Sequence, residues 1–485
     1  MSKADLGLSR RRLLLGVSAL TLAGCAVGLS GELYSASGAP APSSDLNAGR
    51  KQPNIIFIMA DDLGYADVSC YGRREYQTPA IDSLAETGMR FMQAYSNSPV
   101  CSATRTALIT GRYQYRLPVG LEEPLTSRKV GLPPSHPTLP GQLRKAGYQT
   151  ALVGKWHLGA LPDYGPLKSG YDHFWGVRGG SVDYFRHESM MGQNDLWDGE
   201  TEFHETAYLT ELFGDRSVEM IDQMSQDGKP FFLSLHFTAP HWPWEGPDDR
   251  AESERIKDAG QYGLLHLDGG SLETYAEMVV SMDQQIARVI SKLQELGIED
   301  ETIIVFTSDN GGERFADTWP FSGIKTELLE GGLRVPMIVR WPGVTQPGSV
   351  SQQVTMSMDM MPTLLHVGSA SPDPDFPSDG IDLTDALKGA APAPRDVYFR
   401  YMNLDQKALR SGDWKYLKIA DVSYLFNVEE DPKERANLIA RYPEKFAELK
   451  TQYDDWEASM LPLDPAANTH GYTGEMLADH FHVTD

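Results

Sequence analysis

Reactive side chains follow four short apolar runs of this chain, each at the point where the run ends. In chain order they are Asp61 with Asp62, Lys155 with His157, His241, and Asp309 with Asn310. Carboxylate and amide oxygens are the hard ligands that calcium and magnesium prefer, whereas lysine and histidine supply positive charge and proton transfer. Taken singly, each cluster is more often structural, because polar residues commonly end buried strands and cap helices. Together they favour a calcium or magnesium site, rather than a zinc site, beside acid–base groups.

Cys101 raises a separate question, because the stretch PVCSATRTALITGR (99–112) places it just before a helical pattern, with Arg105 four residues later. At a helix N-terminus the backbone N–H groups favour anions, and Arg105 would lie on the same helical face. A buried core thiol and an activated thiolate nucleophile are both ordinary interpretations of such a cysteine. The hard oxygen ligands expected around it argue against both, because a soft thiolate matches such a metal poorly.

The elements that must position these residues alternate between β-rich apolar runs and helical patterns, which indicates α/β layering. We expect strands at 54–60, 149–153, 231–237 and 302–307, each followed by one of the reactive clusters. A helix is expected over 271–297, where apolar residues recur at three- and four-residue steps. In open α/β sheets the ligand binds beyond the carboxyl ends of the strands. We therefore expect the four clusters to converge on one site.

Composition and charge limit the function classes. The 485 residues are 41% hydrophobic and 10% aromatic, which is ordinary for a globular protein with room for two unequal domains. The formal net charge of −24 at pH 7 argues against a nucleic-acid partner, because binding phosphate backbones requires clustered lysine and arginine. An anionic substrate would need its charge met locally, inside a site.

The first residues, MSKADLGLSRRRLLLGVSALTLAGC, are typical of a targeting segment, although an ordinary amphipathic terminus is the alternative. Residues 9–14 resemble a twin-arginine export signal, and LAGC resembles the lipoprotein box that is lipidated on its cysteine, here Cys25. We expect a signal over 1–25, a flexible linker over 26–50, and a location in the periplasm or outer envelope, with membrane contact only through the lipid. Cys70 and Cys101 remain in the mature chain and allow at most one disulfide.

The stretch CSATRTALITGR (101–112) resembles the signature of the type I sulfatases, in which the cysteine of a CxPxR or CxAxR core is converted to formylglycine after translation. The resemblance continues in the family's order through MADDLGYADVSCYG, GKWHLG, His241-Trp242-Pro243, SDNGG and GIKTELLEGGLRVP (323–336). It covers nearly the whole mature chain, and six elements in one order are unlikely to arise by chance. The chain departs from the usual signature at Ala103, where proline is usual, and at Thr104, where serine is common.

This resemblance implies an alkaline-phosphatase-like α/β fold. A large mixed sheet between helices is expected in a catalytic domain over 51–385, and a small antiparallel sheet with a helix is expected in a C-terminal subdomain over 386–485. Strand-like runs at 396–402, 408–419 and 423–428, followed by a helical pattern at 442–460, agree with that expectation.

The resemblance also implies sulfate ester hydrolysis, one Ca²⁺, and a maturation enzyme that generates formylglycine. The implied calcium ligands are Asp61, Asp62, modified Cys101, Asp309 and Asn310. The implied catalytic residues are Cys101, Arg105, Lys155, His157, His241 and Lys325. Arg105 would fix the hydrated aldehyde, and Lys155 with Lys325 would offset charge on the transferring group. His157 would take a proton, and His241 with Lys325 would serve the leaving oxygen.

A sulfated carbohydrate is the expected substrate, because residues 170–188 resemble the corresponding stretch of hexosamine-sulfate sulfatases. Arg178 and Arg186 would add positive charge to the pocket, and specificity is expected in the loops at 113–126, 173–204 and 242–267. The alternatives are an aryl sulfatase acting on small aryl sulfates, or a phosphodiesterase or phosphonate monoester hydrolase of the same superfamily. A catalytically silent glycan-binding lipoprotein is the non-enzyme alternative; it is disfavoured because Cys101, Lys155 and His157 are all present.

Overall fold

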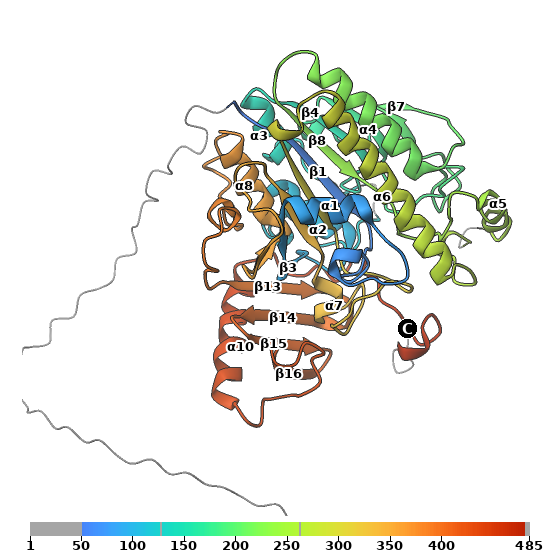
Figure 1. Ribbon diagram of the computed structural model, residues 1–485. Coiled ribbons are helices and arrows are strands. Elements are labelled where there is room, and N and C mark those ends of the chain that lie inside the picture. The colour runs from blue at the N-terminus through green and yellow to red at the C-terminus, as the bar shows by residue number, and fades with distance from the viewer. Residues whose placement is uncertain (1–50, 127–128, 261–262, 481–485) are drawn as a thin grey trace, which may run out of the picture. The chain divides into compact units, whose positions relative to one another are not determined.

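The computed structural model describes residues 51–126, 129–260 and 263–480, which belong to one compact unit of the chain (Figure 1). The expected signal, linker and lipidation site at Cys25 lie outside the described residues. Among the described residues, no helix combines the length and apolar character that crossing a bilayer requires.

Ten of the described strands form one large mixed sheet. In spatial order they are β11 (Ser349–Ser351), β2 (Met89–Phe91), β10 (Met337–Arg340), β9 (Thr302–Ser308), β1 (Asn54–Ala60), β8 (Phe231–His236), β4 (Gln149–Lys155), β5 (His173–Val177), β6 (Leu196–Asp198) and β7 (Thr201–Glu202). The five strands from β9 to β5 run parallel, and β10 and β6 pair antiparallel at either side of them.

The four strands expected ahead of the reactive clusters are confirmed, and they are neighbours in this sheet. Every residue of β1, β8 and β9 is buried, as expected for strands that are covered on both faces. β4 continues to Lys155, two residues beyond its predicted end, because its pairing with β5 extends to Val177. β9 extends to Ser308, one residue beyond its predicted end, whereas β8 ends at His236, one residue before its predicted end.

Helices cover both faces of the large sheet (Figure 1). One face carries α1 (Pro79–Thr87), α4 (Leu209–Ser225) and α6 (Leu272–Glu295), and the other carries α2 (Cys101–Thr110), α3 (Leu139–Lys145), α8 (Met360–Val367) and α9 (Thr384–Leu387). α6 confirms the helix predicted over 271–297: the Ser271 side chain accepts a hydrogen bond from the Thr274 N–H at its start, and Gly297 follows its end with a φ of 67°.

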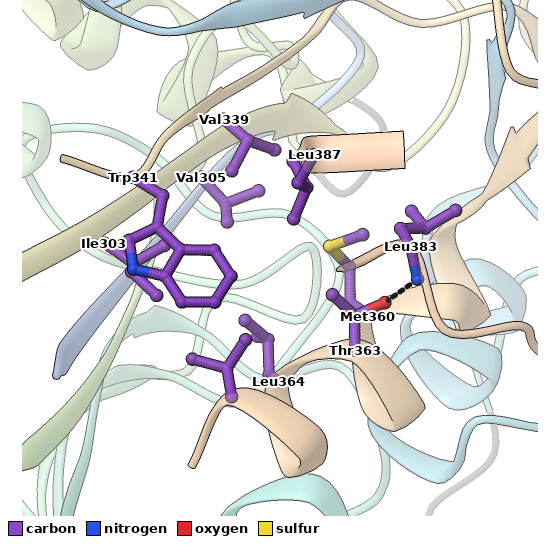
Figure 2. A pocket seen from close by; sticks show the side chains of 10 residues that line it. Ile303, Val305, Val339, Trp341, Met360, Thr363, Leu364, Leu383 and Leu387 are labelled. Atoms are coloured by element: carbon purple, nitrogen blue, oxygen red, sulfur yellow. Dashed lines mark hydrogen bonds between the residues drawn. The ribbon is translucent and has the colours of Figure 1, made fainter. Parts of the chain in front are cut away.

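β9 contributes side chains to the cores on both faces, because successive residues of a strand point to opposite sides. Ile304 and Phe306 belong to the core beneath α1, α4 and α6. Ile303 and Val305 instead face α8 and α9, where they line an apolar cavity of about 10 Å³ with Trp341 (Figure 2). That space is about the size of one water molecule and has apolar walls, so this region is core rather than a ligand site.

A second sheet lies in the C-terminal part, as expected. It consists of β13 (Asp396–Tyr401), β14 (Gln406–Ser411), β15 (Trp414–Ile419) and β16 (Val422–Asn427), paired antiparallel in that order. The predicted run at 408–419 divides into two strands around Gly412, which has a φ of 58°. One face of this sheet packs on α10 (Pro443–Ala458), and the other packs on residues near Tyr95 and Leu328.

The remaining described strands and α-helices are short. They are β3 (Ala94–Tyr95), which pairs with β12 (Thr355–Met356), and the helices α5 (Arg250–Asp258) and α7 (Glu330–Leu333). A large mixed sheet between helices, followed by a small antiparallel sheet with one helix, is the fold class that the sequence indicated. The predicted domain boundary between residues 385 and 386 falls within α9 and stays a prediction.

Candidate active site

The structure brings the four reactive clusters together at the carboxyl edge of the large sheet. Because β1, β4, β8 and β9 are parallel neighbours, the loops that follow them open at the same edge. Ligand atoms of Asp61, Asp62, Cys101 and His241 all lie within 4.8 Å of one another, and all four residues are buried. Asp309 is joined to this group by the Asp62 N–H, which donates to its Oδ1 at 3.3 Å.

Cys101 is the first residue of α2 and is 1% exposed, which confirms its predicted place at a helix N-terminus. The Thr104 hydroxyl fixes the preceding turn by accepting from the Ser98 N–H and donating to the Ser98 carbonyl. Burial, then the neighbouring Asp61 carboxylate, raises the pKa of the Cys101 thiol. Cys70 and Cys101 are both free thiols, so the one disulfide that the sequence allowed is not formed.

Three buried cations each hold a carboxylate of the cluster. Arg105 donates to Asp309 Oδ2 from Nε at 3.0 Å and from Nη2 at 2.8 Å, which is a bidentate arrangement. Lys155 Nζ donates to Asp61 Oδ2, and Lys325 Nζ donates to Asp62 Oδ2 at 2.6 Å. Burying an isolated charge costs a large desolvation free energy. Pairing with an opposite charge offsets that cost.

These contacts also set the pKa values of two site residues. Burial alone would raise the pKa of Asp309, but Arg105 and Lys155 bring it below its ordinary value. Burial alone would lower the pKa of Lys325, but Asp62 and its neighbours bring it above its ordinary value. Both side chains therefore stay charged in the buried site.

The two site histidines are neutral and are held in defined tautomers by backbone carbonyls. His157 Nε2 donates to the Leu125 carbonyl at 2.9 Å, and His241 Nδ1 donates to the Trp242 carbonyl at 2.6 Å. Burial, then the nearby lysines, lowers the pKa of both imidazoles well below the ordinary value. His157 Nδ1 and His241 Nε2 thus carry lone pairs, and the latter lies 3.6 Å from Asp62 Oδ2.

Two oxygen atoms of the cluster suit a metal ion. Asp61 Oδ1 and Asn310 Oδ1 are buried and accept no hydrogen bond from the protein. Burial, then repulsion from the Asp309 carboxylate, raises the pKa of Asp61. A hard divalent cation would satisfy both oxygens and lower that repulsion. The predicted ligands Asp61, Asp62, Asp309 and Asn310 therefore fit calcium or magnesium.

Three residues in the loops of this site have an unusual backbone conformation. Asp62, His157 and Thr326, which follows Lys325, have φ values of 62°, 58° and 71°, in the left-handed region that residues other than glycine seldom adopt. Such conformations cost free energy and persist where the surrounding structure holds them in place. Each of the three turns directs a site residue toward the cluster.

Several contacts at this site could not be found from the sequence. The segment around Leu125 links the site residues: its N–H donates to the Ser102 hydroxyl at 2.7 Å, and its carbonyl holds His157. The Tyr472 hydroxyl, from the C-terminal end of the described chain, donates to Glu313 Oε1 near the site. No local pattern marks either contact, since the partners come from distant parts of the chain.

The expectation that Arg186 adds positive charge to the pocket is not supported, whereas the same expectation for Arg178 stays a prediction. Arg186 is ion-paired with Asp183 at 2.7 Å and with Glu188 at 3.1 Å, so its charge is already neutralised. The Arg178 guanidinium carbon lies 3.3 Å from the ring centroid of Trp197, a cation–π contact. Positive charge at the site comes from Arg105, Lys155 and Lys325.

Comparison with known families gives two matches along the chain. A family model described as Sulfatase matches residues 53–370. A second, described as N-sulphoglucosamine sulphohydrolase, C-terminal, matches residues 324–458. The first match covers more than half of the chain and includes every predicted site residue.

Individual relatives agree with the family models. N-acetylgalactosamine-6-sulfatase of Rattus norvegicus is 32% identical over 397 residues, which cover 76% of this chain and 72% of that protein. Arylsulfatase J of Mus musculus is 29% identical over 492 residues, which cover 87% and 79%. The crystal structure of Ps i-CgsB in complex with k-i-k-neocarrahexaose superposes with a TM-score of 0.77 at 28% identity and covers 89% of this chain and 98% of that one.

The extent of these matches, together with the buried cluster of carboxylates, cations and Cys101, identifies the family. The chain belongs to the type I sulfatases, hydrolases that act on sulfate esters.

Proposed function

We propose that the protein removes sulfate esters from carbohydrate, using a formylglycine made from Cys101 and one calcium ion. The observation that carries the proposal is the cluster within 4.8 Å of Cys101, where Asp61 Oδ1 and Asn310 Oδ1 are buried without a hydrogen-bond partner. A thiol with a raised pKa is a poor nucleophile there. An oxygen at the same position would join a set of hard ligands.

The calcium ion would supply a Lewis acid, and a hydrated aldehyde at residue 101 would supply two hydroxyl groups, one to attack sulfur and one to expel sulfate. The ligands from this chain would be Asp61, Asp62, Asp309 and Asn310. Arg105 keeps Asp309 in one orientation through its two hydrogen bonds. Its Nη1 also donates to the Lys155 carbonyl at 3.0 Å, which ties the β4 end to α2.

Lys155 and Lys325 would offset the charge of the sulfuryl group during transfer. The Lys155 ammonium group contacts Asp61 and the Lys325 ammonium group contacts Asp62, beside Cys101. Both lysines are buried. Electrostatic stabilisation is strong in such a site, because the donors are fixed and water is excluded. Lys155 and Lys325 would contact the sulfate, and Asp61 and Asp62 would hold the ion.

His157 would act as the base toward residue 101. Its Nε2–H is held by the Leu125 carbonyl, so the lone pair on Nδ1 is the atom available to take a proton. That nitrogen is buried and has no hydrogen-bond partner. The lowered pKa keeps the imidazole neutral and able to accept the proton whose removal expels sulfate.

Lys325 and His241 would serve the leaving oxygen. Lys325 has a raised pKa and is the proton-bearing group, while His241 Nε2 lies 3.6 Å from Asp62 Oδ2. The lowered pKa of His241 reflects burial and then Lys325. An entering sulfate ester would bring a negative charge that raises this pKa.

A carbohydrate substrate is favoured by the relatives. One is an N-acetylgalactosamine-6-sulfatase, and the solved structure of Ps i-CgsB holds a neocarrahexaose. With a calcium ion bound, the three cations of the site would also suit a locally anionic, otherwise polar ligand in a chain of net charge −24.

Free sulfate should be measured with a panel of sulfated mono- and oligosaccharides, small aryl sulfates, phosphodiesters and phosphonate monoesters. The proposal expects the highest kcat/KM on a sulfated saccharide. A higher value on an aryl sulfate would reject the carbohydrate assignment, and a higher value on a phosphodiester or phosphonate would reject the preference for sulfate. An inert protein that still binds glycans would support the non-enzyme alternative.

We also propose export after maturation, because a twin-arginine route carries folded proteins and the modification would occur on the unfolded chain. Replacing Arg10 and Arg11 by lysine should leave modified, active enzyme inside the cell. Trapped material that carries only unmodified Cys101 would contradict this order.

A further inference from the structure

Residues 461–480 return from α10 to the carboxyl edge of the large sheet. In Figure 1 the chain runs from α10 to a C-terminal end on the other side of the four-stranded sheet. These residues lie beyond residue 458, where the second family match ends.

The segment contacts the loop that holds His157. The Glu123 N–H donates to the Asn468 carbonyl at 2.9 Å, and the His470 N–H donates to the Glu123 carbonyl at 3.0 Å. Glu123 and Thr469 thus form a short parallel bridge. Leu125, two residues later, is the hydrogen-bond partner of His157.

The segment also contacts the loops on either side of Lys325. The Tyr472 hydroxyl donates to Glu313, and the Gly312 carbonyl next to Glu313 accepts from the Lys325 N–H at 2.9 Å. His480 Nε2 lies 2.8 Å from Glu327 Oε1, two residues after Lys325. Two contacts of the segment therefore lie within two residues of groups that hold or follow Lys325, the residue assigned to the leaving oxygen.

Glu313 is the unusual residue among these contacts. It is 4% exposed, its Oε1 accepts from Tyr472, and its Oε2 is buried without a hydrogen-bond partner. The carbonyl of the preceding residue, Gly312, accepts from the Lys325 N–H at 2.9 Å, which places Glu313 beside the Lys325 loop. A buried acceptor without a donor costs free energy, so a ligand hydroxyl that reached it would be bound strongly.

We propose that residues 461–480 form a wall of the substrate pocket on the leaving-group side, and that Glu313, held by Tyr472, accepts a hydrogen bond from a hydroxyl of the sugar that carries the sulfate. This inference rests on the proposed function, because it takes Lys325 as the residue beside the leaving oxygen. It assigns sugar recognition to Glu313 and to a segment outside the loops at 113–126, 173–204 and 242–267. Small aryl sulfates have no hydroxyl to offer this acceptor.

The test compares Glu313→Gln and Tyr472→Phe with the wild type on the best sulfated monosaccharide of the panel and on 4-nitrophenyl sulfate. For Glu313→Gln the ratio of the two kcat/KM values should fall about 10- to 100-fold in favour of the aryl ester, since a charge-assisted hydrogen bond is lost. Tyr472→Phe should lower the ratio about threefold to tenfold, because Glu313 loses the group that positions it. Glu299→Gln, before the amino end of β9, is the matched control and should leave the ratio unchanged.

Deoxy analogues of the sulfated sugar provide a readout that a purely structural role would not move. Removal of one hydroxyl should cost the wild type about tenfold or more and cost Glu313→Gln much less, because the two changes remove the same interaction. Equal losses in both proteins, or no costly hydroxyl in the wild type, would overturn the inference. If Glu313→Gln does not fold, Tyr472→Phe and the deoxy series on the wild type decide the question. A wild type that hydrolyses only aryl sulfates would overturn the proposed substrate together with this inference.

Discussion

Two buried charge clusters of similar composition each contain a carboxylate oxygen without a hydrogen bond, but a cation lies 2.9 Å from Glu434 Oε1 in one and 3.8 Å from Asp61 Oδ1 in the other. Around Cys101, the cluster of Asp61, Asp62 and Asp309 includes cations, yet Asp61 Oδ1 accepts no hydrogen bond and Asn310 Oδ1 beside it accepts none either. At the junction of α7 and the small sheet, Glu330 accepts from Lys415 at 2.9 Å and from Arg334 at 2.6 Å. Lys415 also lies 2.9 Å from Glu434 Oε1.

The difference indicates two uses for buried charge. In the Lys415 cluster the oxygen without a hydrogen bond, Glu434 Oε1, still has the Lys415 ammonium group 2.9 Å away, so both glutamates contact a cation and the cluster joins α7 to the small sheet. In the Cys101 cluster the acceptor atoms Asp61 Oδ1, Asn310 Oδ1 and His157 Nδ1 have no hydrogen-bond partner from the protein. We infer that the first cluster stabilises the fold and that the second is completed by a ligand.

The largest expected effect is on turnover. Cys101→Ala should lower kcat/KM about 10⁴-fold or more, because residue 101 supplies the atoms that attack and release sulfur. The melting temperature should change little, since no buried charge is left without its partner. Cys70→Ala is the matched control: it removes the other free thiol and should leave the kinetics as they are. Activity retained in Cys101→Ala would contradict the inference that the Cys101 cluster is catalytic and the Lys415 cluster structural.

The second effect is on stability. Lys415→Met should lower the free energy of unfolding by about 3–5 kcal/mol, because it leaves Glu330 and Glu434 buried with less compensation. The folded fraction should keep a kcat/KM within about threefold of the wild type, since the cluster contacts no substrate. Lys418→Met, on the same strand at a more exposed ion pair with Asp405, should cost about 0–1 kcal/mol. Equal losses in the two variants would contradict the structural role of the Lys415 cluster.

The third effect concerns the metal. Adding calcium to protein treated with a chelator should raise the melting temperature by about 2–5 °C, because an ion that binds only the folded state stabilises it. Asp61→Asn should reduce that shift, while Lys415→Met should retain it. An equal calcium shift in Asp61→Asn would place the ion elsewhere, and the absence of any shift in the wild type would contradict the assigned ligands.

The smallest expected effect is on the pH dependence of stability. It concerns Glu123, a buried carboxyl group whose hydrogen-bond partners are uncharged. The Glu123 carboxyl is hydrogen-bonded to the Tyr115 hydroxyl at 3.0 Å and the Met402 N–H at 2.8 Å. Burial raises its pKa to about 8 from an ordinary 4.5. Between those values the unfolded chain loses the proton while the folded protein keeps it, so wild-type stability falls as pH rises.

The Glu123→Gln variant keeps the shape of the side chain but replaces the titratable carboxyl group with a neutral amide. Its free energy of unfolding relative to wild type should therefore improve by about 1 kcal/mol or more between pH 5 and pH 8. Denaturant unfolding at several pH values measures this trend. A constant difference across the range would mean that Glu123 is ionised in the folded protein.

Much of the fold and the site could be predicted because the informative residues are local. Each buried strand is a short apolar run, and each reactive cluster directly follows one, so strand position and site position were found together. The end of β4 was predicted two residues early because Gly154 and Lys155 are not typical strand residues; pairing with β5 extends the strand.

The contacts that could not be predicted join residues far apart in the chain. Tyr472 and Glu313 are 159 residues apart, and nothing in either neighbourhood indicates the other. The same holds for Lys415 and Glu330, 85 residues apart, whose pairing depends on how the small sheet packs against α7. The sequence likewise does not show that Asp183 and Glu188 neutralise Arg186, because the ion pairs depend on how the loop folds back on itself.

The most direct test of the central account is the mass of the tryptic peptide FMQAYSNSPVCSATR (91–105) from active enzyme. The account predicts an aldehyde at residue 101, with the modified fraction proportional to kcat across preparations of different maturation. A fully active preparation in which residue 101 is unmodified cysteine would contradict it.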